Sequence, residues 1–275
     1  MACDDWWHAD PGAGYLQNVE PEEELPMEKG KFIVIEGIDG SGVTTEAVKL
    51  KEHIATKLNL PVHLTKEPTD GPVGGLIRTI LAKRVGAPCH NGKFESIDPR
   101  CLALLFAADR LDHLEVDIRP KLEGGVVVIC DRYILSSLAY QSLNVDRRWL
   151  EQINAKGITP DLTVYLQVPP LVAERRRNQA RWHVELYEET PKLERVSQNY
   201  LEAIADLRKR GQRVEVVDGN RPMREVHRDI MALVKPLLTT KAGSARKRRQ
   251  PPVDAPRLDI AFAGENEPGA KEVPV

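Results

Sequence analysis

The residues best suited to chemistry lie between positions 32 and 45, in the run Phe-Ile-Val-Ile-Glu-Gly-Ile-Asp-Gly-Ser-Gly-Val-Thr-Thr. The β-branched segment Phe32–Ile35 is typical of a buried strand, and the stretch Val43–Leu58 is compatible with a helix. Between them, two glycines and a threonine have the spacing of a loop whose backbone N–H groups surround a phosphate at a helix N-terminus. We therefore expect a nucleotide phosphate site made of Gly37, Ile38, Asp39, Gly40, Ser41, Gly42, Val43, Thr44 and Thr45, with the Thr44 hydroxyl as a Mg²⁺ ligand.

One position departs from this pattern, because Val43 stands where such loops carry a lysine. That lysine places a mobile positive charge on the β- and γ-phosphates. Lys49 and Lys51 lie about two helical turns further on, ~9–12 Å along the axis, and cannot take its place. The loss of one preorganised donor typically costs ~10²–10³ in rate. Three explanations stay open: compensation by other cations, a weakened or inactive homologue, or a deliberately altered sequence.

Strand-like and helix-like segments alternate through the middle of the chain. Short runs rich in β-branched residues predict strands at Phe32–Ile35, Val62–Thr65, Val126–Cys130, Leu162–Val168 and Arg213–Val217. One intervening helix should begin at Asp98-Pro99, with Asp98 as N-cap, and another should cover Leu193–Arg210. This alternation predicts an α/β fold, a doubly wound parallel sheet that binds its ligands outside the carboxyl ends of the strands.

Further polar groups follow the other predicted strands, in the segments 65–71, 131–141 and 175–181. All of them should converge on the edge of the sheet that holds the phosphate loop. Several arginines at that edge match phosphate-bearing ligands, because the planar guanidinium pairs well with phosphate. Asp131 ends a strand there, and its carboxylate is expected to hold Mg²⁺ unless it only pairs with a neighbouring arginine.

The composition of the chain argues against several classes of protein. The chain of 275 residues has a formal net charge of −2, which gives no overall electrostatic reason to expect nucleic-acid binding. Its four cysteines show neither a metal-like spacing nor a disulfide framework, so a cytoplasmic location fits. No segment approaches the ~20 apolar residues that span a bilayer, and no membrane partner is expected.

Three regions are predicted along the chain. Residues 1–30 are acidic and turn-rich and are expected to form a flexible arm, although Trp6 and Trp7 could dock on the core. Residues 31–238 hold the alternating elements and should form the folded domain. Residues 239–275 contain Arg246–Arg249 and two following prolines, which favour a disordered, solvated tail over a nucleic-acid or localisation patch.

Four motifs, taken in order, resemble the thymidylate kinase family, and its archaeal members most closely. They are the phosphate loop, Thr-Lys-Glu-Pro-Thr-Asp from Thr65, Leu-Leu-Phe-Ala-Ala-Asp-Arg ending at Arg110, and Asp-Arg-Tyr-x-x-Ser-Ser-Leu-Ala-Tyr-Gln from Asp131. The resemblance covers about Lys31 to Leu238. It implies a P-loop kinase fold with a five-stranded parallel sheet, helices on both faces and a mobile lid. It also implies phosphorylation of dTMP to dTDP, with ATP and Mg²⁺, and a homodimer.

The resemblance assigns the acceptor side to residues of these motifs. Phe106 would stack on the thymine ring, although packing in the core is an equally good reading of its position among leucines. Arg110 and Arg132 would hold the acceptor monophosphate, and Asp39 would lie near its sugar and phosphate. The remaining expected contacts are Ser137 and Gln141 with the base edge, Tyr140 against the 2′ position, Glu67 as an orienting group for an arginine, and Arg78 with phosphate.

The segment from Arg175 to Glu188 would be the lid over ATP. Its arginines, Arg177 and Arg181 above all, would approach the transferring phosphoryl group and complete a catalytic set with Asp39 and Arg132. The alternative is that these arginines simply form a solvated basic face of a helix. The segment also departs from many family members, because no arginine precedes the aromatic Tyr187.

Two other functions stay open on the sequence. The nearest enzymatic alternative is another nucleoside monophosphate kinase, acting on UMP or CMP. The other is a catalytically impaired nucleotide-binding homologue, which Val43 would explain. Binding of MgATP discriminates between an enzyme and this last possibility.

Overall fold

The computed structural model describes residues 29–85, 87, 88, 94, 95, 97–180 and 190–239. Residues 1–28 of the predicted arm, residues 240–275 of the predicted tail and residues 181–188 of the predicted lid, Arg181 included, therefore lie outside the described residues. No helix in the described ranges is long and apolar enough to cross a membrane.

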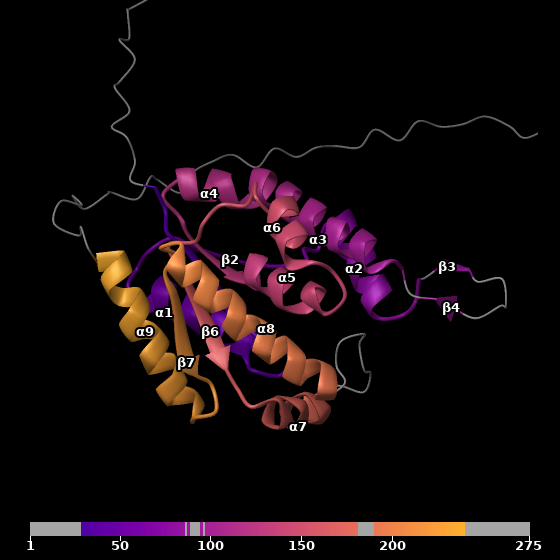
Figure 1. Ribbon diagram of the computed structural model, residues 1–275. Helices are drawn as coiled ribbons and strands as arrows, with labels where there is room; N and C mark the ends of the chain where they lie inside the picture. Colours follow the sequence, from indigo (N-terminus) through magenta and orange to yellow (C-terminus); the bar gives the residue numbers. More distant parts are fainter. Residues whose placement is uncertain (1–28, 86, 89–93, 96, 181–189, 240–275) are drawn as a thin grey trace, which may run out of the picture. The chain divides into compact units, whose positions relative to one another are not determined.

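A five-stranded parallel sheet lies at the centre, with strand order β2-β5-β1-β6-β7 (Figure 1). The strands are β1 (Phe32–Gly37), β2 (Val62–Lys66), β5 (Val127–Asp131), β6 (Leu162–Gln167) and β7 (Val214–Asp218). Each overlaps a predicted strand to within one or two residues, and all of the pairings are parallel. The middle strand β1 has β5 on one side and β6 on the other, so crossovers leave it in both directions and a crevice forms at its carboxyl end.

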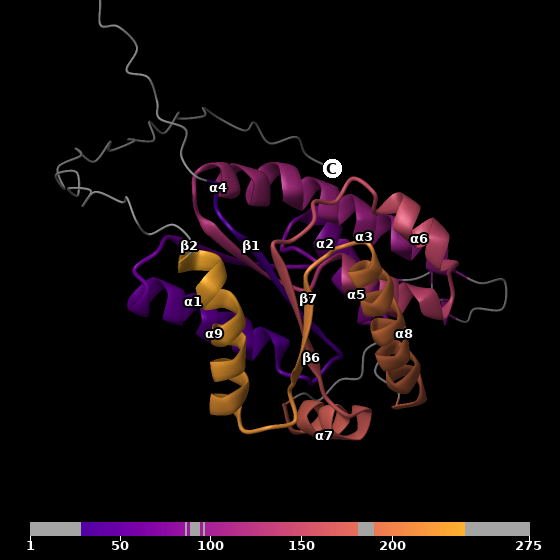
Figure 2. The same ribbon diagram turned by 60° about the vertical axis from the view of Figure 1, so that its left-hand side comes forward.

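Helices cover both faces of the sheet (Figure 2). Alternate residues of β1 point to opposite faces, as a strand requires. Ile33 and Ile35 pack with residues of α1 (Val43–Lys57) and α9 (Met223–Thr239), whereas Phe32 and Val34 pack with Leu114 and Tyr133 on the other face. Burial of both sets explains why β1 reads as a continuous apolar run rather than as an alternating one.

The second face is covered by several helices in sequence. They are α3 (Pro99–His113), the π-helical turn η1 (Leu114–Ile118), α4 (Arg119–Glu123), α5 (Ile134–Tyr140), the 3-10 turn η2 (Gln141–Leu143), α6 (Arg147–Ile153) and α8 (Thr190–Lys209). The side chain of Asp98 accepts a hydrogen bond from the backbone of Arg100, which confirms the predicted start of α3. The helix expected over Leu193–Arg210 is also confirmed, and begins three residues earlier.

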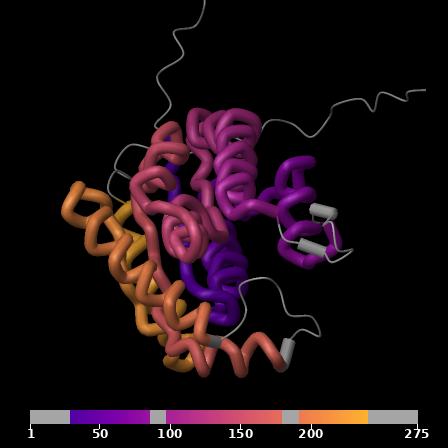
Figure 3. Tube along the Cα trace, turned by 45° about the vertical axis from the view of Figure 1, so that its right-hand side comes forward, coloured from indigo at the N-terminus to yellow at the C-terminus, as the bar shows by residue number. Residues whose placement is uncertain are grey.

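Two helices complete the rim of the crevice. Helix α2 (Pro72–Leu81) packs beside α3 (Figure 3), and α7 (Pro170–Ala180) follows β6 directly. A short antiparallel pair, β3 (Ala87–Pro88) and β4 (Phe94–Glu95), follows α2. The sequence did not predict this pair, because strands of two residues carry no usable periodicity.

Candidate active site

The phosphate loop joins β1 to α1 and depends on glycine at two positions. Gly40 and Gly42 have φ angles of +87° and +96°, in the left-handed region that favours glycine. A side chain at Gly40 would also collide with the backbone of Ala173 in α7, whereas one at Gly42 would meet no atom within 4 Å. The loop thus turns sharply into the N-terminus of α1 and lies against α7.

One cavity of about 780 Å³ opens beside this loop, at the carboxyl ends of the strands. Its volume is ordinary for a small-molecule site. Most of the predicted site residues line it: Ile38, Asp39, Gly40, Ser41, Gly42, Val43, Thr44, Thr45, Glu67, Arg78, Phe106, Arg110, Asp131, Arg132, Ser137, Tyr140, Gln141 and Arg177. Gly37 lies behind the loop, where its carbonyl accepts a hydrogen bond from Tyr200. Residues up to 139 positions apart in the chain, Ile38 and Arg177, thus lie together at this edge of the sheet.

Thr44 and Asp131 bring two oxygen ligands together in the cavity wall. The Thr44 hydroxyl donates to Asp131 Oδ2 at 2.6 Å. Asp131 comes from the end of β5 and Thr44 from the first turn of α1, so the parallel pairing of β1 with β5 brings them together. A hydroxyl beside a carboxylate is the donor chemistry that Mg²⁺ prefers, and this pair fits the metal site expected from the sequence.

Arg132 and Tyr140 form a second polar group with Asp39 of the phosphate loop. Arg132 donates to Asp39 Oδ1 at 2.8 Å, and the Tyr140 hydroxyl donates to Asp39 Oδ2 at 2.9 Å. The Arg132 guanidinium also lies over the Tyr140 ring, 5.3 Å from its centroid. The backbone of Arg132 has a φ of +69°, which is uncommon for a non-glycine residue. Asp39 is thus fixed between a cation and a phenol.

The buried carboxyl group of Glu36 holds the backbone beside these residues in place. Glu36, fully buried in β1, accepts hydrogen bonds from the backbone N–H groups of Tyr133 and Ser136 at 2.8 and 3.1 Å, and from the Tyr200 hydroxyl at 3.1 Å. Its pKa is raised to about 7 because burial penalises the charged form, although its hydrogen bonds and Arg132 act in the opposite direction. Glu36 therefore anchors the turn after β5, which carries Arg132.

Arg110 lies deep in the opposite wall and is held by protein groups. Its Nε donates to Glu67 Oε2 at 2.9 Å, and its other nitrogens reach Ser137 Oγ at 2.9 Å and the side-chain oxygen of Asn154. Arg110 and Glu67 are both almost fully buried, so the charge of the arginine is balanced by a carboxylate. The sequence offered no structural reason for Arg110, and the structure supplies one.

The turn after β2 is fixed to α3 and α2. Asp109 accepts hydrogen bonds from the backbone and hydroxyl of Thr69, at 2.8 and 2.6 Å. Arg78 donates to the carbonyls of Pro68 and Thr69 and pairs with Asp70. Phe106 is half-buried, packs against the apolar cluster of α2 and α3, and also lines the cavity. The position of Phe106 is therefore compatible both with stacking on a base and with packing in the core.

Gln141 carries a group that suits a ligand. Its Oε1 atom is buried and has no hydrogen-bond partner within the part of the chain that the structure describes. Because buried polar atoms are normally paired, this oxygen in a cavity wall suits a bound molecule with N–H groups.

Val43 is buried, and it both lines the cavity and packs in the apolar cluster under α1. Helix α7 brings two arginines to the same cavity. Ala173 meets the phosphate loop, and Arg176 and Arg177, three and four positions further on, share its helix face. Both arginines line the cavity, and Arg177 is buried.

Sequence reasoning missed several residues that hold the site. Glu36 was hidden inside a strand, Asn154 follows the last residue of α6, and Tyr200 lies on α8, with no motif around either. His113, buried beside Glu67, was also missed. Among these residues, only Glu36 carried a usable signal in the sequence, because it is a polar residue within an apolar strand.

A phosphate loop, a hydroxyl–carboxylate pair and several arginines around one cavity define a nucleotide-binding phosphotransferase of the P-loop class. The sequence model described as "Thymidylate kinase" matches residues 35–230. A protein named probable thymidylate kinase from Pyrococcus abyssi is 42% identical over 209 residues, which are 75% of this chain and 97% of that protein. One of the same name from Pyrobaculum aerophilum is 38% identical over 211 residues, 76% of this chain and 99% of that protein. The chain belongs to the thymidylate kinase family.

Proposed function

We propose that the protein transfers the γ-phosphoryl group of ATP to dTMP, giving dTDP and ADP. An oxygen of the acceptor phosphate attacks the γ-phosphorus directly, and the bond between that phosphorus and the oxygen bridging to the β-phosphate breaks. Little covalent chemistry is left for the protein, which contributes positioning and charge. The single observation that carries the proposal is the shared cavity, in which Arg132 and Tyr140 contact the phosphate loop through Asp39.

On the donor side, the backbone of residues 37–45 would hold the ATP phosphates at the N-terminus of α1. Thr44 and Asp131 would hold Mg²⁺, directly or through water, because their oxygens already lie together at the cavity wall. The metal ion would neutralise charge on the phosphates. Arg177 supplies the cation that best replaces the missing lysine, and Arg181, four positions later in the sequence, stays a prediction.

On the acceptor side, Arg132 and Asp39 would contact the monophosphate and sugar. The Tyr140 ring would occupy the space that a 2′-hydroxyl needs, because its position is fixed by Asp39 and by the arginine stacked on it. Phe106 would cover the base, and Ser137 and Gln141 would contact its edge. Arg110 and Arg78 are held by protein groups, so we propose that their remaining N–H groups, rather than free charge, contact the acceptor.

A coupled assay of ADP release tests the proposal, with dTMP, dUMP, UMP and CMP offered separately at saturating MgATP. We expect turnover with dTMP and a clear preference over UMP, and calorimetry should show the same order of affinities. Equal use of dTMP and UMP would contradict the role of Tyr140. Binding of dTMP without transfer to any monophosphate would instead favour the catalytically impaired homologue that Val43 suggests.

We also propose a homodimer and a cytoplasmic location. The exposed side chains of Leu104 and Leu111 are seven positions apart on α3 and form one apolar face, which supports self-association. Cys101 and Cys130 are free thiols, which suits a reducing compartment. Sedimentation of the wild type and of Leu104→Glu tests the dimer, since a charge on this face should favour monomer.

A further inference from the structure

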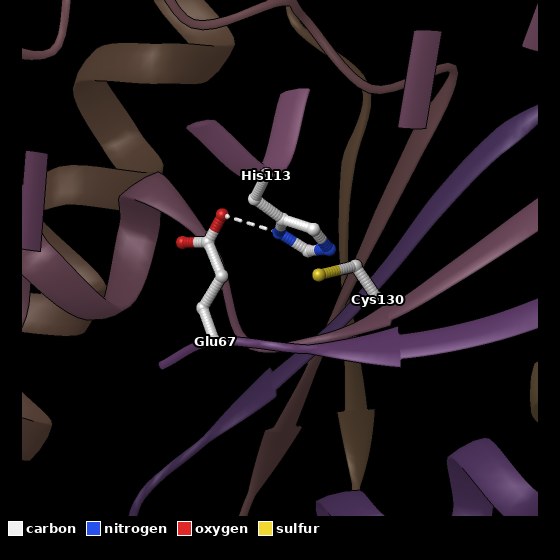
Figure 4. A group of neighbouring side chains, drawn as sticks. All are labelled: Glu67, His113 and Cys130. Carbon is white, nitrogen blue, oxygen red and sulfur yellow. Dashed lines mark hydrogen bonds and ion pairs between the residues drawn. The ribbon is translucent and has the colours of Figure 1, made fainter. Parts of the chain in front are cut away.

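Three buried side chains from three segments of the chain lie together (Figure 4), and one of them, Glu67, also lines the cavity. They are Glu67 at the end of β2, His113 at the end of α3 and Cys130 in β5, and their ligand-type atoms all lie within 4.8 Å of one another. His113 Nδ1 lies 3.2 Å from Glu67 Oε1, and Glu67 Oε2 accepts from Arg110. The two carboxylate oxygens of Glu67 thus serve two different partners.

The hydrogen bonds define what the His113 ring does. An ionised carboxylate only accepts hydrogen bonds, so Nδ1 must be the donor toward Glu67. The other nitrogen, Nε2, lies 2.6 Å from the Thr65 hydroxyl and 3.6 Å from Asp117 Oδ2. Thr65 comes from β2 and Asp117 from η1, so the ring is oriented from both sides of the contact between the sheet and α3.

These contacts indicate that the three side chains hold one another and their neighbours by hydrogen bonds rather than binding a metal ion. Burial raises the pKa of the Cys130 thiol well above its ordinary value, and the thiol donates to the Arg132 carbonyl at 3.0 Å. A metal would need that thiol as a thiolate and would need Glu67, which already balances the charge of Arg110. Both nitrogens of His113 are in use as well.

We propose that His113 is a positioning residue that, through Glu67, fixes the guanidinium of Arg110 in the acceptor wall. Without the bond from Nδ1, the Glu67 carboxylate is free to rotate about its last side-chain torsion, which is a soft one. Arg110 then loses the ion pair that sets its orientation toward the cavity. This inference rests on the proposed function, because Arg110 matters only if the cavity holds the acceptor nucleotide.

Two substitutions separate this role from simple packing. His113→Asn places an N–H₂ group near the position of Nδ1, so it keeps the bond to Glu67. His113→Gln places its amide nearer the position of Nε2, so it keeps the contact with Thr65 and loses Glu67. His63→Gln is the matched control, because His63 contacts Asp117 and is not a partner of Glu67.

The measurements are KM for dTMP, KM for ATP, the dTMP Kd from calorimetry and the melting temperature of each variant. We expect His113→Gln to raise the KM and Kd for dTMP ~10-fold, the scale of one lost bond to a charged group, with KM for ATP unchanged. His113→Asn and His63→Gln should stay near wild type for dTMP. Equal losses in His113→Asn and His113→Gln, or a parallel change in KM for ATP, would overturn the proposal.

Two further outcomes have distinct meanings. If the wild type neither binds nor phosphorylates dTMP, the proposed function fails and this inference fails with it. If the wild type works and His113→Gln equals it, only the role of His113 is wrong. Stoichiometric binding of Zn²⁺ alone, lost in Cys130→Ser, would replace the positioning role by a metal site.

Discussion

At the scale of single residues, Val43 takes part both in the apolar core and in the cavity wall. Its side chain packs with Ile33 and Ala47 under α1, and it also faces the cavity. A valine completes the apolar cluster and leaves no charge for the phosphates. The polar part of the site is otherwise assembled, since Thr44 contacts Asp131 and Arg132 contacts Asp39.

We expect Val43→Lys to raise turnover with dTMP and to tighten MgATP. The gain should reach up to ~10²–10³, the value of one preorganised phosphate donor. Steady-state kinetics with dTMP and calorimetry with MgATP measure it, and Arg177→Ala is the companion variant. No gain in Val43→Lys, together with an inactive Arg177→Ala, would show instead that α7 already supplies the charge.

Glu36 predicts a pH dependence of stability. Its carboxyl has a pKa of about 7 in the folded protein and near 4.5 otherwise, so the folded state holds the proton more tightly. The free energy of unfolding therefore falls as the pH rises between these values, by on the order of 3 kcal/mol at ~1.4 kcal/mol per pKa unit. Below the lower value both states are protonated, and this penalty is absent.

Glu36→Gln should remove that dependence, because the amide keeps the acceptor for Tyr133 and Ser136 and cannot ionise. Urea unfolding should give a variant that is more stable than wild type at pH 8 and similar to it near pH 4.5. The control is Glu52→Gln, an exposed glutamate on α1. A wild type whose stability rises from pH 5 to pH 8 relative to Glu36→Gln would contradict this sign.

At the scale of elements, helix α7, which begins the predicted lid segment, contacts the phosphate loop directly. Gly40 meets the backbone of Ala173 so closely that a β-carbon there has no room. Arg176 and Arg177 line the cavity from the same helix.

Gly40→Ala should therefore be more harmful than Gly42→Ala. Both substitutions place alanine at a positive φ, which costs ~1–2 kcal/mol. Gly40→Ala adds a collision with α7, whereas Gly42→Ala meets open space. Thermal unfolding should show a lower melting temperature for Gly40→Ala, and equal melting temperatures would mean that α7 moves away without cost.

The strands of the large sheet and the start of α3 could be predicted from local sequence patterns. Every strand of the five-stranded sheet was predicted, because a strand buried on both faces is a continuous β-branched run. The start of α3 followed from Asp98 and Pro99 in the same way. The hairpin of β3 and β4 was not predictable, since its four residues depend on surroundings rather than on a repeating pattern.

At the scale of the whole molecule, the apolar clusters of the sheet and its helices lie between Phe32 and Leu238. We expect a chain of residues 29–239 to keep the fold and the dTMP affinity, because the predicted arm and tail hold too little apolar surface to repay their ordering. Calorimetric melting of the full chain and the trimmed chain tests this. A drop of many degrees would indicate that Trp6 or Trp7 docks on the core.

The sequence by itself determined the phosphate loop, the parallel α/β fold and the family, because each is written in short runs whose spacing has a local physical meaning. Glycines at fixed offsets allow a sharp turn, and β-branched runs form buried strands. Tertiary structure alone decided which polar groups meet. Glu36 reaches Ser136 across 100 positions, and Glu67 divides its oxygens between Arg110 and His113 across 43 and 46 positions. Such partners are chosen by strand order and helix packing, which bring distant residues to one sheet edge and leave no trace in local spacing.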